Sequence, residues 1–177
     1  MKFIEKYQDL WHTAAGEDGP IPHPNPTPNQ LLTLEQWHAV RDTWPVGLPT
    51  GVIVPNHVDI EEIEPDLPRL QLVVLQFPKW IDGRAYSQAR ILRSRFRYGG
   101  EVRATGDVVV DMMPLLQRTG FDAVALRGDQ KREHAERALG FFAGHYQGDV
   151  REHRPLFARP IEERQAAAEF VNQGAAI

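Results

Sequence analysis

The sequence of 177 residues contains no cysteine. This excludes disulfide bonds, thiolate zinc sites, cysteine-ligated iron–sulfur clusters and thiol redox chemistry. No apolar run approaches the roughly 20 residues of a membrane span, and the first residues, MKFIEKYQDLW, lack the apolar core of a signal peptide. We therefore expect a cytoplasmic protein that does not interact with membranes.

Several motifs of common enzyme classes are also missing. There is no Gly-x-Gly-x-x-Gly or Gly-Lys-Ser/Thr fingerprint, no Gly-x-Ser-x-Gly elbow, and no His-x-x-x-His or His-Glu-x-x-His pair among the seven histidines. Asp107 and Asp111 are four residues apart and would share a helix face, but acids at a helix entry are common for dipole reasons. We therefore predict no metal site. The net charge of -4 argues against nucleic acid as a partner.

The sequence falls into three parts. Residues 1–48 form an N-terminal extension with a proline-rich strap, Gly19–Pro28, and a short helix opened by the capping box Thr33 to Gln36. Residues 49–158 form the core domain, and residues 159–177 form a tail that we expect to be frayed or loosely docked. The strap is interpreted as an extended connector, with a proline-motif binding role as the alternative.

Apolar runs alternate with helical patterns along the core domain. Strands are predicted at Gly51–Pro55, Leu70–Phe77, Glu101–Thr105 and Phe121–Leu126, and the first residues fit either a helix or a short edge strand. Helices are predicted around Ala85–Phe96, over Val108–Arg118 with Pro114 as a kink or later start, and after a cap at Asp129. This pattern predicts an α/β fold with a mostly parallel sheet of about four to five strands and βαβ crossovers. An incomplete β/α barrel is the alternative.

Two turns that follow predicted strands carry side chains suited to a ligand, because ligands in parallel α/β folds lie beyond the carboxyl ends of the strands. The candidate ligand-binding residues are Asp82, Gly83, Arg84, Tyr86, Ser87, Arg103, Thr105, Gly106 and Asp107. Asp82 and Asp107 are placed as helix caps, and Thr105-Gly106 as a small anion cradle. Ordinary capped turns, tied by an Arg84–Asp107 or Arg103–Asp82 ion pair, explain the same residues.

The charge is distributed unevenly. Residues 1–70 carry a net charge of about -7, whereas residues 79–103 carry about +5. Arg90, Arg93 and Arg97 are spaced to form a basic stripe on one helix face. A solvated surface explains such a stripe. The alternative is docking on an acidic partner, or on the acidic first third of this chain.

Three motifs between Phe77 and Leu126 resemble those of a bacterial family of unknown function. They are Asp82-Gly83-Arg84-Ala85-Tyr86-Ser87 with Ala89-Arg90, then Gly100 to Val108, and Gly120 to Ala123. Members of that family are often labelled as oxidoreductases of sulfite reduction and are encoded near sulfite-reductase and sulfate-reduction genes. Ala85, Pro114 and the proline-rich strap depart from the family pattern. The resemblance covers roughly residues 50–145 and brings no established catalytic residues.

The resemblance implies a role in assimilatory sulfate and sulfite reduction for cysteine biosynthesis. One hypothesis is an accessory protein that docks on sulfite reductase or another sulfate-reduction enzyme. A second is an oxidoreductase with a bound flavin or nicotinamide, because a chain without cysteine needs a cofactor for redox chemistry. A third is a module in which Arg84 and Arg103 clamp a small anion. The sequence leaves open whether the protein is an enzyme.

Overall fold

The computed structural model describes residues 1–5, 7–16, 19–142 and 145–174. Seven strands form one sheet in the order β1-β9-β8-β7-β6-β5-β2, and every pair in it is parallel. Their bounds are β1 (Lys2–Phe3), β2 (His12–Thr13), β5 (Gln30–Thr33), β6 (Thr50–Val54), β7 (Leu72–Phe77), β8 (Glu101–Gly106) and β9 (Ala123–Val124). A separate antiparallel pair joins β3 (Ala15–Gly16) and β4 (Gly19–Pro20), the latter at the start of the proline-rich strap.

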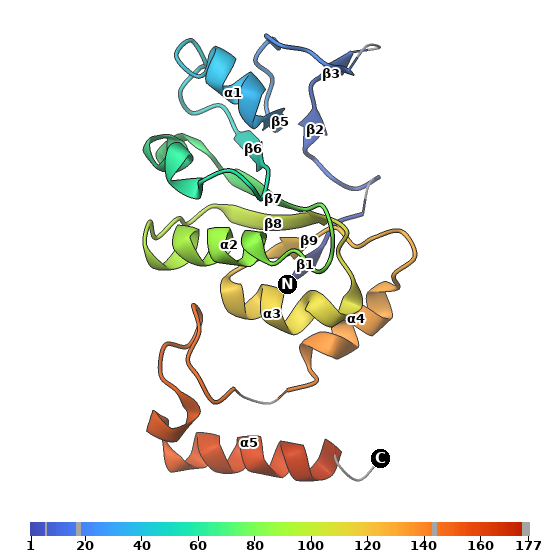
Figure 1. Cartoon of the computed structure of the whole chain (residues 1–177), viewed down its shortest axis with the longest axis vertical. Coiled ribbons are helices and arrows are strands. Elements are labelled where there is room, and N and C mark those ends of the chain that lie inside the picture. The colour runs from blue at the N-terminus through green and yellow to red at the C-terminus, as the bar shows by residue number, and fades with distance from the viewer. Residues whose placement is uncertain (6, 17–18, 143–144, 175–177) are drawn as a thin grey trace.

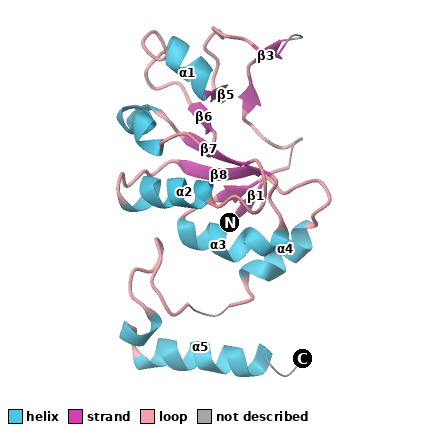
Figure 2. Cartoon of the chain, viewed as in Figure 1, coloured by secondary structure: helices cyan, strands magenta, loops and turns pink. Residues whose placement is uncertain are grey.

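The sheet is curled into a half-barrel. From β5 to β9 each strand lies beside the next one in the sequence, and helical segments cross between them (Figures 1 and 2). The predicted α/β class with a parallel sheet is confirmed, and the incomplete barrel describes the curl. The first residues form an edge strand, β1, which is one of the two predicted alternatives. The sheet has more strands than the predicted four to five, because β2 and β5, of two and four residues, are too short to give a period.

The helical segments show which local predictions were correct. Thr33 and Gln36 form the predicted capping box at α1, through bonds of 3.1 and 2.8 Å, and Pro114 lies in the first turn of α3. Asp129 does not cap α4, because this helix begins at Arg132. The Asp129 carboxylate binds Arg127 instead. The segments are α1 (Leu34–Val40), η1 (Ile60–Arg69), α2 (Arg84–Ser94), η2 (Val110–Met112), α3 (Met113–Thr119), α4 (Arg132–Leu139), η3 (Leu156–Ala158) and α5 (Ile161–Gly174).

The core lies between the sheet and the helices. Val73, Leu75 and Phe77 of β7 alternate with Leu72 and Val74, so the strand has two apolar faces. The first face belongs to the large cluster that includes apolar side chains of α1, η1, α2, α3 and α4. The second face belongs to a small cluster, with Leu31, Leu72 and Val74 at its centre.

The N-terminal residues cover this second face. Because β1 and β2 lie at opposite edges of the sheet, the chain between them passes across it, and we call residues 7–11 the crossing segment. Trp11 packs beside Leu31, Leu72 and Gly51, and a Cβ at Gly51 would lie 3.1 Å from the Trp11 ring. The crossing segment therefore fills part of the space that other strands occupy in a closed barrel.

The tail forms the 14-residue helix α5, which lies farthest from the sheet in Figure 1. The expectation from the sequence is a frayed or a loosely docked tail. Residues 161–174 form a regular helix rather than a frayed segment, residues 161–166 are exposed, and residues 175–177 lie outside the described part. None of the helices in the described ranges is both long and apolar enough to cross a membrane.

Candidate functional site at the carboxyl edge of the sheet

The loops that follow β7, β8 and β9 meet at the carboxyl edge of the sheet, because the strands are parallel. Asp107 joins all three loops. Its Oδ2 accepts a hydrogen bond of 2.9 Å from the backbone N–H of Trp80, and its Oδ1 accepts one of 2.6 Å from Nη1 of Arg127. Gly106 makes this approach possible, since it has a φ of 99° and a Cβ there would lie 2.4 Å from the carbonyl oxygen of Phe77.

The charged side chains at this edge neutralise one another. Arg127 also binds both carboxylate oxygens of Asp129, at 2.6 and 2.7 Å, and this bond lowers the pKa of Asp129 to about 2. The same guanidinium, together with the N–H of Trp80, lowers the pKa of Asp107. Arg84 binds Asp82 through two bonds of 3.0 and 2.7 Å and lowers the pKa of the Asp82 carboxyl well below its ordinary value. All three acids are therefore ionised at neutral pH.

Two large apolar side chains are exposed beside these ion pairs. Trp80 is 55% exposed and Ile81 is 69% exposed, at adjacent positions in the β7–α2 loop. The loop is held by Asp107 at Trp80 and by a bond of 3.0 Å from the N–H of Asp82 to the carbonyl of Lys79. An ordered loop thus presents a tryptophan and an isoleucine to solvent, directly before the Asp82–Arg84 ion pair and at the backbone that Asp107 binds.

The first turn of α2 is packed against the core below this loop. The Tyr86 ring contacts Phe77 and Phe121, with centroids 5.0 and 6.4 Å apart, and burial raises its pKa to about 12. Gln88 donates to the carbonyls of Pro55 and Val58. Tyr86 is therefore a neutral packing residue at physiological pH.

The predicted ligand-binding residues divide into two groups. Asp82, Gly83, Arg84, Tyr86, Ser87, Thr105, Gly106 and Asp107 do come together at the carboxyl edge or in the first turn of α2. Arg103 does not. It pairs in register with Val74, three residues before the end of β7, and it is 2% exposed.

Arg103 is bound by two carboxylates on the face covered by the crossing segment. Its guanidinium donates to Oε1 of Glu101 at 2.9 and 2.7 Å, and to Oδ2 of Asp9 at 2.6 Å. The predicted Arg103–Asp82 and Arg84–Asp107 ion pairs are therefore wrong, because each partner has a nearer one. Asp9 is 94 residues away in the sequence, so no local pattern indicates this contact.

The Thr105-Gly106 turn is not an open anion cradle. The N–H of Asp107 donates to the carbonyl of Phe77 at 2.7 Å, and the N–H of Val108 donates to that of Gly106 at 2.9 Å. Asp107 is not a helix cap either, because η2 begins at Val110, and so Asp107 and Asp111 do not share a helix.

The α2 entrance is likewise already occupied by a carboxylate. Its N-cap is Gly83, without a side-chain cap bond, but Asp82 accepts from the N–H of Arg84 at 3.3 Å. A cofactor phosphate at this turn would have to displace the Asp82 carboxylate. Within the described residues, no group of three or more His, Asp or Glu side chains is arranged to hold a metal ion.

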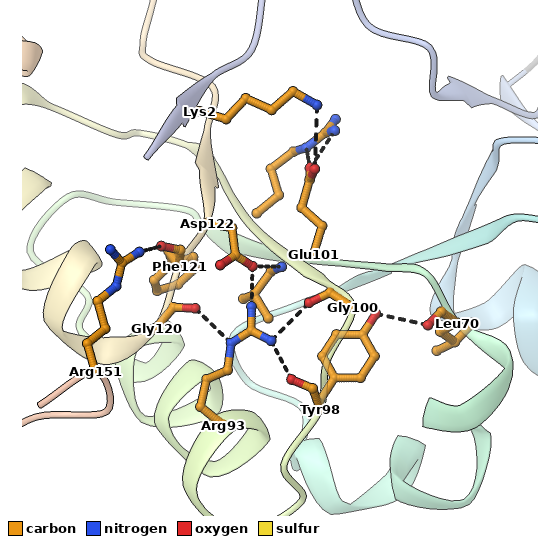
Figure 3. A network of polar contacts seen from close by, with 12 residues as sticks. Lys2, Leu70, Arg93, Tyr98, Gly100, Glu101, Gly120, Phe121, Asp122 and Arg151 are labelled. Carbon is orange, nitrogen blue, oxygen red and sulfur yellow. Dashed lines mark hydrogen bonds and ion pairs between the residues drawn. The ribbon is translucent and has the colours of Figure 1, made fainter. Parts of the chain in front are cut away.

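The predicted basic stripe is not formed as one face of a helix. α2 ends at Ser94, and Arg97 lies beyond it with a φ of 51°. Arg93 is turned inward, where it donates to the carbonyls of Gly120 (3.0 Å) and Gly100 (2.9 Å) and also binds Tyr98 and Asp122 (Figure 3). Of the three arginines of the stripe, only Arg90 is both within α2 and exposed.

Sequence reasoning missed three residues of the carboxyl edge. Trp80 and Ile81 lie between the predicted strand that ends at Phe77 and the predicted helix that starts at Ala85, so neither predicted element buries them, which is a usable signal of exposure. Arg127 stands two residues before Asp129, but its bond to Asp107 is set by the fold.

Comparisons with known proteins place the chain in a family without assigning an activity. A search of curated proteins finds no match. The model of a bacterial protein family of unknown function, DUF934, matches residues 51–157, which span the strands β7, β8 and β9 and all three loops of the carboxyl edge. The chain belongs to the DUF934 family.

Proposed function

We propose that this protein is a non-catalytic accessory of assimilatory sulfite reduction that docks on sulfite reductase or another sulfate-reduction enzyme. The docking surface is the carboxyl-edge surface, defined as Trp80, Ile81 and the ion pairs around them. The resemblance of its three motifs to a family labelled for sulfite reduction supports the process. The exposed Trp80–Ile81 pair supports docking.

The pair has the character of an interface centre. Tryptophan is enriched among the residues that dominate binding energy, and a surrounding ring of polar side chains excludes water from such centres. Here the polar groups beside the pair are Asp82 with Arg84, which follow it in the chain, and Asp107, which binds the Trp80 backbone, with its partner Arg127. Because Asp107 holds the backbone at Trp80, little loop ordering remains to oppose binding.

The arrangement of the arginines favours docking over the anion clamp. Arg103 is buried against Glu101 and Asp9, on the face beneath the crossing segment, while Arg84 is at the carboxyl edge with Asp82. A single small anion cannot bridge two guanidinium groups placed in this way. Each would also have to exchange a carboxylate that it already binds.

The test compares binding of purified sulfate-reduction enzymes, sulfite reductase first, to the wild type and to the Trp80→Ala/Ile81→Ser variant by calorimetry at low salt. We expect the variant to lose at least about tenfold in affinity, since truncating an interface centre costs about 2 kcal/mol or more. Tyr7→Ala is the matched control, because Tyr7 is 99% exposed and lies in the crossing segment. Unchanged affinity in the Trp80/Ile81 variant, or no binding of any pathway enzyme to the wild type, would refute the proposal.

A further inference from the structure

A second surface feature lies at the amino end of the sheet, where α2 and α3 end. Two adjoining hollows of about 160 and 230 Å³ share Arg90 of α2 and the loop residues Gly148, Asp149 and Val150. Ser94 and His153 complete the smaller hollow, whereas Leu115, Arg118, Thr119 and Gln147 complete the larger one. Because helices in such crossovers run antiparallel to the strands, these hollows are at the opposite end of the sheet from Trp80.

The loop that walls both hollows is fixed in place. The N–H of Val150 donates to the carbonyl of Arg118 at 3.3 Å, and Arg151 reaches the carbonyl of Phe121 at 3.3 Å (Figure 3). The loop also closes on itself, since a Cβ at Gly148 would lie 2.1 Å from the carbonyl oxygen of His153. The wall is therefore preorganised rather than formed on binding.

The charges that line the hollows are unequally engaged. Asp149 accepts from the N–H groups of Arg151 (2.9 Å) and Glu152 (3.0 Å) and pairs with Arg118 at 3.4 Å. Within the described residues, neither the Arg90 guanidinium nor the His153 imidazole has a hydrogen-bond or ion-pair partner. Both side chains line the smaller hollow. The hollow therefore offers a positive charge and N–H donors that bind no acceptor among the described residues.

We propose that the smaller hollow is a binding site for a small oxyanion held between Arg90 and His153. The guanidinium presents parallel N–H groups that match two oxygens of a sulfate, phosphate or carboxylate. An imidazole N–H can donate to a third oxygen of sulfate or phosphate, or to the remaining lone pair of a carboxylate oxygen. The adjoining hollow, with Leu115 and Val150 in its wall, accepts an aliphatic group attached to that anion. The site is independent of the Trp80 surface, because it shares no residue with it.

The site is tested by titrating the isotope-labelled protein with sodium sulfate, sodium phosphate and sodium acetate, at constant ionic strength set with sodium chloride. We expect saturable amide shifts confined to residues 90–94, 118–119 and 147–153. Arg90→Ala and His153→Ala should each weaken binding at least about tenfold. Arg137→Ala removes an exposed arginine of α4 that lines neither hollow, and its titration should match the wild type.

The outcomes separate the site from nonspecific ion binding and identify the source of the anion. Shifts spread over the whole surface, or equal responses in all three variants, would overturn the proposal. A hexaglutamate peptide that binds the same residues more tightly than sulfate would identify the oxyanion as an acidic side chain of a protein. Tighter binding of sulfate or phosphate would identify a free anion. Trp80→Ala/Ile81→Ser should leave every titration unchanged, so this site and the docking surface can fail separately.

Discussion

The two ends of the sheet use charged side chains in opposite ways. At the amino end, Arg93 is 16% exposed on its side chain and donates to carbonyl oxygens that follow α2 and end α3. At the carboxyl end, Asp107 accepts from the backbone N–H of Trp80 and from Arg127, and the Arg127 side chain is 41% exposed. At the amino end, a positively charged side chain binds buried carbonyl oxygens. At the carboxyl end, a negatively charged side chain binds the backbone of a solvent-exposed loop.

The direction of the helices explains this contrast. Helices that cross between parallel strands end near the amino edge of the sheet, where their last carbonyl groups lack partners, and begin near the carboxyl edge, where their first N–H groups lack partners. Arginine satisfies the former, as Arg93 does at Gly120, the residue that caps α3. Aspartate satisfies the latter, as Asp82 does at Arg84. The same geometry thus places stability at one end and exposed, ordered loops at the other.

The largest expected effect comes from removing the buried cation. Arg93→Met would leave the carbonyls of Gly100 and Gly120 and the Asp122 carboxylate without their shared donor. Because an unsatisfied buried acceptor costs about 1–3 kcal/mol, we expect the free energy of unfolding to fall by about 3 kcal/mol or more. Urea unfolding followed by circular dichroism measures this loss.

Arg90→Met is the matched control for that change. It makes the same substitution in the same helix, one turn away, at a side chain that is exposed. Its expected effect on the free energy of unfolding is within about 0.5 kcal/mol. Equal losses in the two variants would show that the inward contacts of Arg93 do not distinguish it from a surface arginine.

An intermediate effect is expected between the two ends, at Arg103. Asp9→Ala removes the bond of 2.6 Å that joins the crossing segment to Arg103, while Glu101 still holds the guanidinium. It also removes the acceptor of the Trp11 N–H at 3.2 Å, so the opening is read from the other amides of the segment. We expect the free energy of local opening of residues 7–11 to fall by about 1–2 kcal/mol. Native-state hydrogen exchange reports this opening.

The control for Asp9 is Lys2→Ala, which removes an exposed partner of the same network at 3.5 Å from Glu101. It should change the exchange of residues 7–11 little, since exposed ion pairs contribute only about 0–1 kcal/mol. If Asp9→Ala left the protection of the crossing segment unchanged, Trp11 and its apolar contacts would be its main attachment.

Features set by neighbouring residues could be predicted from the sequence. The Thr33–Gln36 capping box, the apolar strand ending at Phe77 and the later helix start at Pro114 each depend on contacts within a few residues. The sequence also predicts that the Asp82 and Asp107 turns lie close together, because consecutive parallel strands end at the same edge of the sheet.

Features set by distant residues could not be predicted. The partner of Arg103 comes from the crossing segment, and that of Asp107 comes from the loop after β9. The Arg90–Arg97 stripe failed for a local reason. The chain leaves the helix after Ser94 so that Tyr98 can turn inward and donate to the carbonyl of Leu70. Apolar spacing alone does not reveal such an early helix end.

The smallest expected effect is at the carboxyl end and depends on pH. Arg127 and the N–H of Trp80 hold the pKa of Asp107 below its ordinary value of about 4. A carboxyl whose pKa is lowered by folding stabilises the protein above its unfolded pKa, and this contribution is lost as the pH falls through the folded pKa. Asp107→Asn should therefore lower the melting temperature slightly at pH 7, and the difference from wild type should shrink as the pH falls below about 4. Thermal melts at intervals from pH 7 to pH 2.5 measure this difference. A difference in melting temperature that stayed constant from pH 7 to pH 2.5 would mean that the shape of the Asp107 side chain, rather than its charge, holds the Trp80 loop.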